Sequence, residues 1–208
     1  MQKENGIIDI IKGRRSIRAF TADPVPRSVI EMVLVAAQWA PSGGNKQNWR
    51  FIVAETPEIK EKMHQVVVSR VNAIVQRIAS PRAQKEYSSY SSYYMFFAQA
   101  PAVIAVVKKP YDSLARRIME RSGLAGDYHG SADVQGPAAA IQNMLLAAHA
   151  LGYGTCWMTG PLVAKEELEE ILSITAPDEL IALVPLGAPA KVSAPPERTP
   201  LADIVEYR

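Results

Sequence analysis

The sequence lacks features that several large classes of protein require. It contains one cysteine, Cys156, in 208 residues, so no disulfide can form within the chain, as is usual in a reducing compartment. No segment approaches the ~18 consecutive apolar residues of a membrane span. The opening MQKENGIIDIIKGRR intersperses charged and polar residues among its apolar ones, unlike a signal peptide. Lys and Arg (23) nearly balance Asp and Glu (21), without a long basic run. These absences predict a cytoplasmic protein that binds neither membranes nor nucleic acid.

Common catalytic and metal-binding motifs are also missing. The chain has no Gly-x-Gly-x-x-Gly, Walker loop, His-Glu-x-x-His or Gly-x-Ser-x-Gly, and its three histidines (His64, His129 and His149) are far apart. We therefore expect no metal site. A Cys156–His149 nucleophile pair is disfavoured, because both residues fall in segments predicted to be buried. The chemistry is expected to come from a bound cofactor.

The order of predicted elements indicates an α+β fold. Helices are predicted at about 4–12, 26–40, 57–79, 84–99, 133–150 and 165–173, and strands at 49–54, 103–107, 155–159 and 180–186. The helix at 133–150 is apolar nearly all round and should be buried. Residues 109–130 have no clear period and are interpreted as a solvent-facing excursion. With no repeat and no long linker, residues 1–208 are predicted to form a single domain that ends in an extended arm, 195–208.

Two segments carry the residues best suited to bind a ligand. Arg14, Arg15, Ser16 and Arg18 follow the first predicted helix, and guanidinium groups pair bidentately with phosphate. A basic cluster at a helix C-terminus is also favourable through the helix dipole alone. The second segment is the loop 41–48, whose amide side chains offer donors and acceptors that match the edge of a heteroaromatic ring. For this loop taken alone, we favour the alternative of an ordinary helix-to-strand turn.

Four separated regions together resemble the nitroreductase family. They are RRSIRAF with the later APSGGNKQNWRF, then AIQNMLLAAHALGYGTCWMTGP, then Gly187-Ala188-Pro189, and finally Arg198-Thr199-Pro200-Leu201. The regions occur in the family's order and span nearly the whole chain, whereas residues 80–130 match nothing specific and are interpreted as a variable or lid segment. Two departures are Asn48, where the family often has proline, and the sequence WMT before Gly160, which lacks the acidic residue of some branches.

The resemblance implies a fold, a cofactor and a reaction. The implied fold is a mostly antiparallel central sheet flanked by helices in an intertwined homodimer, with flavin mononucleotide (FMN) bound at the interface. The implied reaction is ping-pong: NADH or NADPH delivers a hydride to the flavin and leaves, and an electron-poor acceptor such as a nitroaromatic or quinone is then reduced. The flavin N5 carries the chemistry, so no catalytic side chain is expected.

The resemblance also assigns residues to the FMN site. Arg14, Arg15, Ser16 and Arg18 match the motif that holds the phosphate, the ribityl chain and the polar ring edge. Ser42 and Gly43 match positions that reach the flavin from the partner subunit, and Asn45 and Gln47 match ring contacts. Thr159 and Gly160 match the backbone near the reactive part of the ring, and Arg198 matches a late arginine on the phosphate.

The sequence does not decide between two roles for an aromatic stripe, and it leaves three rival functions. Tyr87, Tyr90, Tyr94 and Phe97 share one face of the predicted helix 84–99. We favour a core stripe, although the intervening serines lower helix propensity and keep a substrate lid with Tyr90 and Tyr94 in play. The rival functions are another flavin reaction on the same fold (a dehalogenase or dehydrogenase), a non-catalytic flavin-binding module, and an anion-binding structural protein.

Overall fold

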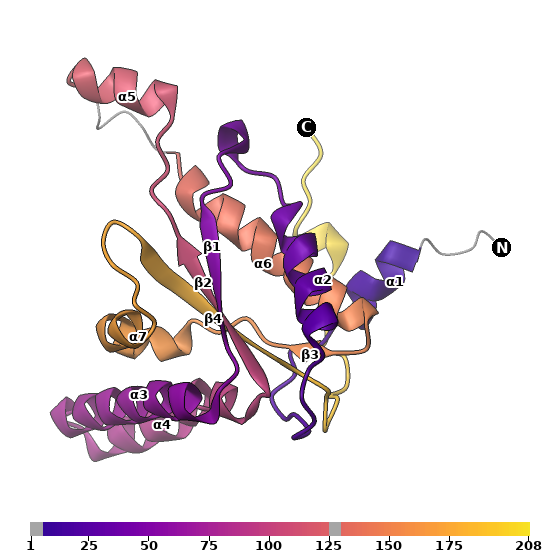
Figure 1. Cartoon of the computed structure of the whole chain (residues 1–208), viewed down its shortest axis with the longest axis vertical. Coiled ribbons are helices and arrows are strands. Elements are labelled where there is room, and N and C mark those ends of the chain that lie inside the picture. Colours follow the sequence, from indigo (N-terminus) through magenta and orange to yellow (C-terminus); the bar gives the residue numbers. More distant parts are fainter. Residues whose placement is uncertain (1–5, 125–129) are drawn as a thin grey trace.

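A four-stranded antiparallel sheet lies at the centre of the structure, a computed structural model that describes residues 6–124 and 130–208 (Figure 1). The strands are β1 (Trp49–Ala54), β2 (Ala102–Lys108), β3 (Gly154–Thr155) and β4 (Glu179–Gly187), in the order β1-β2-β4-β3. Every pairing between these strands is antiparallel. The predicted α+β class and antiparallel sheet are confirmed.

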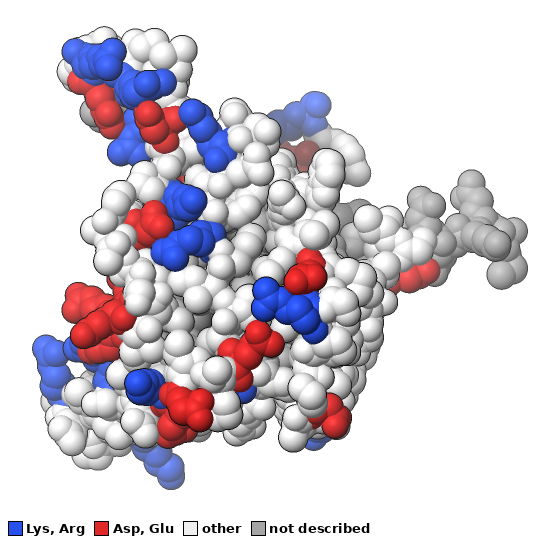
Figure 2. Space-filling model, in the orientation of Figure 1, with Lys and Arg blue, Asp and Glu red and all other residues white. Residues whose placement is uncertain are grey.

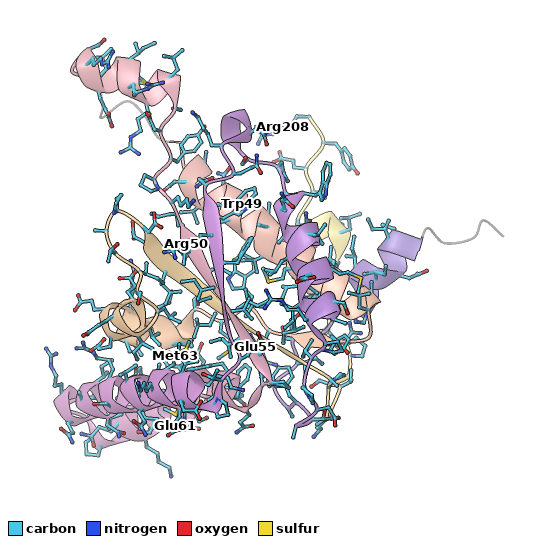
Figure 3. All side chains as sticks on the ribbon, viewed as in Figure 1. Trp49, Arg50, Glu55, Glu61, Met63 and Arg208 are labelled. Atoms are coloured by element: carbon cyan, nitrogen blue, oxygen red, sulfur yellow. The ribbon has the colours of Figure 1, made fainter. Side chains whose placement is uncertain are left out.

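The central strands β2 and β4 are buried on both faces, which explains their unbroken apolar sequences. Along β2, Ile104 and Val106 join one hydrophobic cluster, while Val103 and Val107 join the cluster on the opposite face. Successive side chains of a strand point to opposite faces, so a sheet covered on both sides needs apolar residues at every position. At the edge strand β1, Trp49 packs into the first cluster and its neighbour Arg50 pairs with Asp178 at 3.3 Å (Figure 3).

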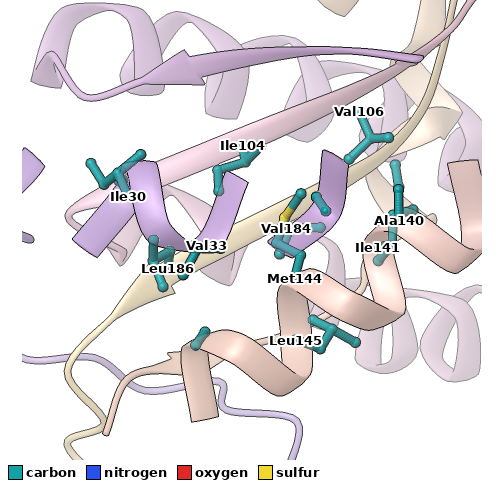
Figure 4. Close-up of a cluster of buried hydrophobic side chains, with 14 of the residues drawn as sticks. Ile30, Val33, Ile104, Val106, Ala140, Ile141, Met144, Leu145, Val184 and Leu186 are labelled. Atoms are coloured by element: carbon teal, nitrogen blue, oxygen red, sulfur yellow. The ribbon is translucent and has the colours of Figure 1, made fainter. Parts of the chain in front are cut away.

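Helices α2 (Arg27–Gln38) and α6 (Ala132–Ala150) cover one face of the sheet. Figure 4 shows Ile30 and Val33 of α2 and Ile141 and Met144 of α6 packed against β2 and β4. Helix α6 follows the predicted range 133–150 closely, and its buried residues include Gly136 and Pro137. The apolar residues outside its buried face include Leu146, which is half-buried, and Val134, which is exposed, so the helix is not buried all round.

The second face is covered by helices α3 (Pro57–Arg77) and α7 (Lys165–Ile171), with α4 (Pro81–Ser91) beside α3 (Figure 1). Met63, Val67 and Val71 of α3 recur every four residues and are buried against the sheet, as expected of an amphipathic helix. Phe97, in a short 3₁₀ turn at Phe96–Gln99 just before β2, is fully buried in the same cluster.

The predicted helix 84–99 is wrong beyond Ser91. Helix α4 ends there, and the chain continues as two 3₁₀ turns, Ser92–Tyr94 and Phe96–Gln99. The hydroxyls of Ser91 and Ser92 donate to the carbonyl oxygens of Ser88 and Ser89, at 3.3 and 2.7 Å. Serine hydroxyls that bond to the local backbone compete with regular helix bonding, so the serine-rich run shortens the helix.

Three other elements differ from the sequence prediction. Helix α5 (Leu114–Arg121) lies within the segment predicted to be irregular, and Ser113 caps it by accepting a hydrogen bond from the Arg116 amide at 3.1 Å. The predicted strand 155–159 is reduced to β3 and an isolated bridge between Met158 and Leu183. Helix α1 (Gly6–Gly13) ends one residue later than the predicted range 4–12. Residues 4 and 5 of that prediction, His129, and 125–129 of the variable segment lie outside the described residues.

No helix within 6–124 or 130–208 combines the length and apolar character needed to cross a membrane.

Phe97 provides a test of the packing on the sheet face that α3 and α7 cover. Replacing Phe97 by alanine leaves a cavity in a fully buried cluster, and such truncations cost about 3–5 kcal/mol. We expect Phe97→Ala to lower the free energy of unfolding in urea by about that amount. The matched control is Gln99→Ala, an exposed position of the same turn, which should change it by less than about 0.5 kcal/mol. Equal effects of the two substitutions would contradict this packing.

Candidate functional site

The Arg14–Arg18 segment is held beside β3 by backbone contacts. The Ile17 amide donates to the Thr155 carbonyl at 2.9 Å, and Ser16 forms a bridge with Thr155. A Cβ at Gly154 would lie 2.6 Å from the Ile17 side chain, so only glycine permits this close approach. Just after this segment, the Thr21 amide donates a hydrogen bond to the Ala188 carbonyl, which fixes the start of the C-terminal tail beside it. The backbone therefore brings the first and last site motifs together.

The Arg14–Arg18 segment and the C-terminal tail line a cavity of about 340 Å³ whose walls are strongly basic. We call it the anion cavity. Its described lining consists of Arg14, Arg15, Ser16, Arg18, Ser193, Ala194, Pro196 and Arg198. No carboxylate is among these residues, and none of the four guanidinium groups pairs with an acid elsewhere in the part of the chain that the structure describes. Unneutralised cations gathered in one concavity attract an anion.

The four arginines are not equivalent. The Arg15 guanidinium donates to the carbonyls of Lys12 and Arg14 at 2.6 and 2.9 Å, so it caps the C-terminus of α1. The structural alternative raised by the sequence, a basic residue at a helix C-terminus, therefore applies to Arg15. Arg18 instead lies over the Tyr93 ring, with its central carbon 5.9 Å from the ring centroid, which is a cation–π distance.

A larger cavity, of about 680 Å³, adjoins the first and shares Arg18 with it. We call it the aromatic cavity. Its described lining consists of Arg18, Tyr90, Tyr93, Tyr94, Phe96, Cys156, Trp157, Met158, Thr159, Gly160 and Val163. The predicted residues Thr159 and Gly160 thus lie in the same cavity as the predicted lid residues Tyr90 and Tyr94. Aromatic rings dominate the walls, and such surfaces bind flat apolar ligands by stacking.

The interpretation of the aromatic stripe as core is wrong for Tyr90. Phe97 is fully buried, but Tyr90 is 63% exposed and lines the aromatic cavity. The stripe divides because the α-helix ends at Ser91, which rotates the later residues away from a common face. Tyr90 contacts its neighbours edge to face, with ring centroids 5.7 Å from Tyr94 and 6.5 Å from Tyr93.

The loop that carries Ser42, Gly43, Asn45 and Gln47 lies elsewhere in the chain. It follows the C-terminal end of α2, whereas the Arg14–Arg18 segment precedes that helix (Figure 1). Helix α2 has 12 residues and so is about 18 Å long. None of the four residues lines the anion cavity or the aromatic cavity. One copy of the chain therefore does not bring the two predicted halves of the site together.

The loop is nevertheless shaped in an unusual way. Asn45 and Gln47 have φ values of 51° and 46°, a left-handed conformation that is costly for side chains other than asparagine and glycine. The Ser42 hydroxyl stabilises it by accepting a hydrogen bond from the Gln47 amide at 2.9 Å. Residues held in such conformations concentrate at functional sites.

Asn48, which stands where the family often has proline, anchors this loop. Its side-chain amide donates to the Asp133 carbonyl at 2.9 Å, and its backbone carbonyl accepts from the Lys109 amide at 3.0 Å. Of these two bonds, only the one to Asp133 depends on the asparagine side chain, so the departure from proline ties the loop to the start of α6.

Cys156 and His149 line different cavities, the aromatic cavity for Cys156 and a smaller one beside Arg15 for His149. Burial raises the pKa of the Cys156 thiol, which disfavours the reactive thiolate. Burial, followed by the charges of Arg14 and Arg15, lowers the pKa of His149. Neither residue is placed for nucleophilic catalysis with the other.

Several lining residues were not found from the sequence. They are Tyr93, Phe96, Trp157, Met158 and Val163 of the aromatic cavity and Ser193, Ala194 and Pro196 of the anion cavity. The dense aromatic run 87–97 signalled the first two, but no local pattern indicates that the tail after Ala190 meets the Arg14–Arg18 segment.

The chain is similar to a known protein family and to several named or provisionally named proteins. The Nitroreductase family model matches residues 11–188. A Methanothermobacter thermautotrophicus protein, provisionally named an NADH dehydrogenase/NAD(P)H nitroreductase, is 30% identical over 89% of this chain and 78% of its own. The iodotyrosine deiodinase of Nematostella vectensis is 26% identical over 94% of this chain and 72% of its own.

Two solved structures are similar over nearly their whole length. A BluB-like flavoprotein from Clostridium difficile 630 is 27% identical with a TM-score of 0.88, covering 97% of this chain and 98% of that chain. A Desulfovibrio desulfuricans protein solved in complex with FMN is 27% identical with a TM-score of 0.70, covering 99% of this chain and 98% of that chain.

Proposed function

Because the chain belongs to the nitroreductase family, we propose that it is an FMN-dependent oxidoreductase. It takes electrons from NADH or NADPH and passes them to electron-poor acceptors such as nitroaromatics or quinones. The observation that carries this proposal is the junction of the anion cavity and the aromatic cavity at Arg18. A molecule with a phosphate at one end and a flat ring at the other would occupy both.

The residues of the two cavities fit FMN. Arg14, Ser16 and Arg198 offer charged and neutral donors to a phosphate without a competing carboxylate in the described lining. Arg18, at the junction, is in position to meet the polar edge of the ring. Thr159 and Gly160 contribute backbone to the wall of the aromatic cavity, as the family motif implies.

The chain's own residues supply binding, orientation and electrostatics. FMN, when bound, supplies the chemistry of hydride acceptance and donation. The arginines keep their charge at any working pH and so hold an anionic group throughout. The aromatic walls orient a planar nicotinamide or acceptor by stacking.

A homodimer is part of this proposal. The ring-contacting loop around Ser42 lies away from both cavities, and a second copy could bring its loop to them. Large apolar residues are exposed on α1, on α2 and along the tail: Ile7, Ile8, Ile11, Met32, Val35, Trp39, Val192, Leu201, Ile204 and Tyr207. Figure 2 shows a largely uncharged area over the C-terminal half of α2. Exposed apolar surface of this extent is typical of an interface.

The enzyme proposal is tested by turnover of the purified, yellow holoprotein. We expect it to oxidise NADH or NADPH and to do so faster when a nitroaromatic or a quinone is present. Boiled protein and free FMN at the same concentration are the controls. If neither nucleotide is oxidised with any acceptor, the chain is a flavin-binding module and not a reductase.

A second candidate reaction is reductive dehalogenation, which the similarity to iodotyrosine deiodinases favours. Residues 80–130 do not show a recognisable lid motif for that reaction, so it ranks behind the first. Release of halide from a halotyrosine by the dithionite-reduced holoprotein, without reduction of nitroaromatics or quinones, would reverse this order.

A further inference from the structure

Reduction of a quinone or nitro group by hydride leaves negative charge on an acceptor oxygen. A hydrogen-bond donor fixed beside that oxygen lowers the barrier, and removing one such donor typically costs about 10²–10³ in kcat. No catalytic side chain is predicted from the sequence. The aromatic cavity, however, has several donors in its wall, and they differ in how firmly they are held.

Most of these donors are poorly suited to hold an acceptor oxygen. Tyr90 and Tyr93 are more than half exposed, and Trp157 is 40% exposed, so their polar groups are solvated. Arg18 is exposed too and stands at the junction proposed for FMN. The Cys156 thiol is a weak donor, and its hydrogen bond to the neighbouring carbonyl is 3.9 Å long.

Tyr94 differs because packing fixes its ring. A Cβ built on Gly160 would lie 2.2 Å from Cδ1 and 2.5 Å from Cε1 of Tyr94, so the ring rests directly on the Gly160 backbone. The Tyr90 ring meets it edge to face at 5.7 Å and 85°. Tyr94 also packs against the buried cluster that contains Phe97, between the sheet and α3. It is half-buried, lines the aromatic cavity and adjoins the backbone proposed to face the reactive part of the flavin.

We propose that Tyr94 is a catalytic residue whose hydroxyl donates a hydrogen bond to the acceptor oxygen during hydride transfer. The proposal rests on the reductase function above. With a quinone, the hydride that originates from NADH or NADPH adds to the acceptor, its electron pair ends on the oxygen that Tyr94 contacts, and a proton from water completes the hydroquinone. Tyr94 stays protonated throughout and is not consumed.

The protonation state of Tyr94 suits a donor. Burial, followed by the nearby Tyr87 and Tyr90, raises its pKa above the ordinary tyrosine value. The donating form exists below that pKa and is lost as the pH rises through it. Quinone reduction should therefore show no loss from this group until the pH exceeds about 10, the ordinary value for tyrosine.

Tyr94→Phe tests the proposal, because it removes the hydroxyl and keeps the ring. For the holoprotein we compare kcat/KM for p-benzoquinone with that for ferricyanide, which accepts an electron without forming an oxyanion. The ratio should fall about 10²-fold or more. The matched control is Tyr87→Phe, which removes a hydroxyl from the preceding helix α4, outside the described cavity lining, and should leave the ratio within about twofold of the native protein.

A second readout needs no turnover. Benzaldehyde bound to the oxidised holoprotein should show a lower carbonyl stretching frequency than when bound to Tyr94→Phe, because a hydrogen bond weakens the C=O bond. A ratio within about threefold of the native one, or equal frequencies in the two proteins, would overturn the role of Tyr94. Failure to oxidise either nucleotide with either acceptor would instead overturn the reductase function.

Discussion

Replacing Arg14 and Arg198 together by glutamine should weaken FMN binding by about 10²- to 10⁴-fold. Both residues line the anion cavity, and neither is paired with an acid in the described structure. Each charged hydrogen bond to a phosphate contributes about 1.5–3 kcal/mol, so the loss of two such bonds predicts this range. Calorimetric titration of the apoprotein with FMN measures the effect, and the lower end is expected at high salt because Arg198 is exposed.

The control for this experiment is Arg82→Gln. Arg82 is a solvent-exposed residue of α4 that pairs with Glu86, and it is not in the described lining of either cavity. Its substitution should leave FMN affinity within about twofold of the native value. If the Arg14/Arg198 double variant binds FMN as tightly as Arg82→Gln, the anion cavity is not the phosphate site.

Replacing Val35 and Trp39 together by glutamate should convert the protein to a monomer that has lost most of its FMN affinity. Val35, in the C-terminal half of α2, is about half exposed, and Trp39, directly after the helix, is 81% exposed. Two carboxylates buried without partners at an interface are strongly destabilising. Because the loop around Ser42 follows this helix and lies away from both cavities of its own chain, loss of the dimer should also remove its ring contacts. Light scattering after size exclusion measures the mass.

The matched control is Ser69→Glu with Asn72→Glu, which adds the same charge at two exposed positions of α3. This variant should stay dimeric and bind FMN normally. A monomeric Val35/Trp39 variant with unchanged FMN affinity would show that a second copy contributes nothing to the site.

The sequence predicts the core elements well because each of them carries a clear apolar pattern within its own residues. Strands β2 and β4 are apolar at nearly every position, and α3 and α6 have long apolar patterns that only buried elements can satisfy. Helix α5 was missed because eight residues are too few to establish a period. The end of α4 at Ser91 depends on hydroxyl–backbone bonds, which a pattern of apolar residues does not reveal.

The candidate site could be predicted only in parts. The Arg14–Arg18 and Thr159–Gly160 segments are found because each is a local run of the family pattern. Their assembly with Arg198 depends on tertiary contacts between the two ends of the chain. The aromatic cavity likewise joins α4 to the segment after β3, far apart in sequence. The separation of the Ser42 loop from the arginines follows from the position of α2, which residue spacing alone does not give.

The most direct test of the whole account is to titrate the apoprotein with FMN and, separately, with riboflavin, which has the same ring but no phosphate. We expect one FMN bound per chain, with riboflavin binding at least about 10²-fold more weakly because the anion cavity is left without its ligand. Equal affinities for the two flavins, or no binding of FMN at all, would contradict it.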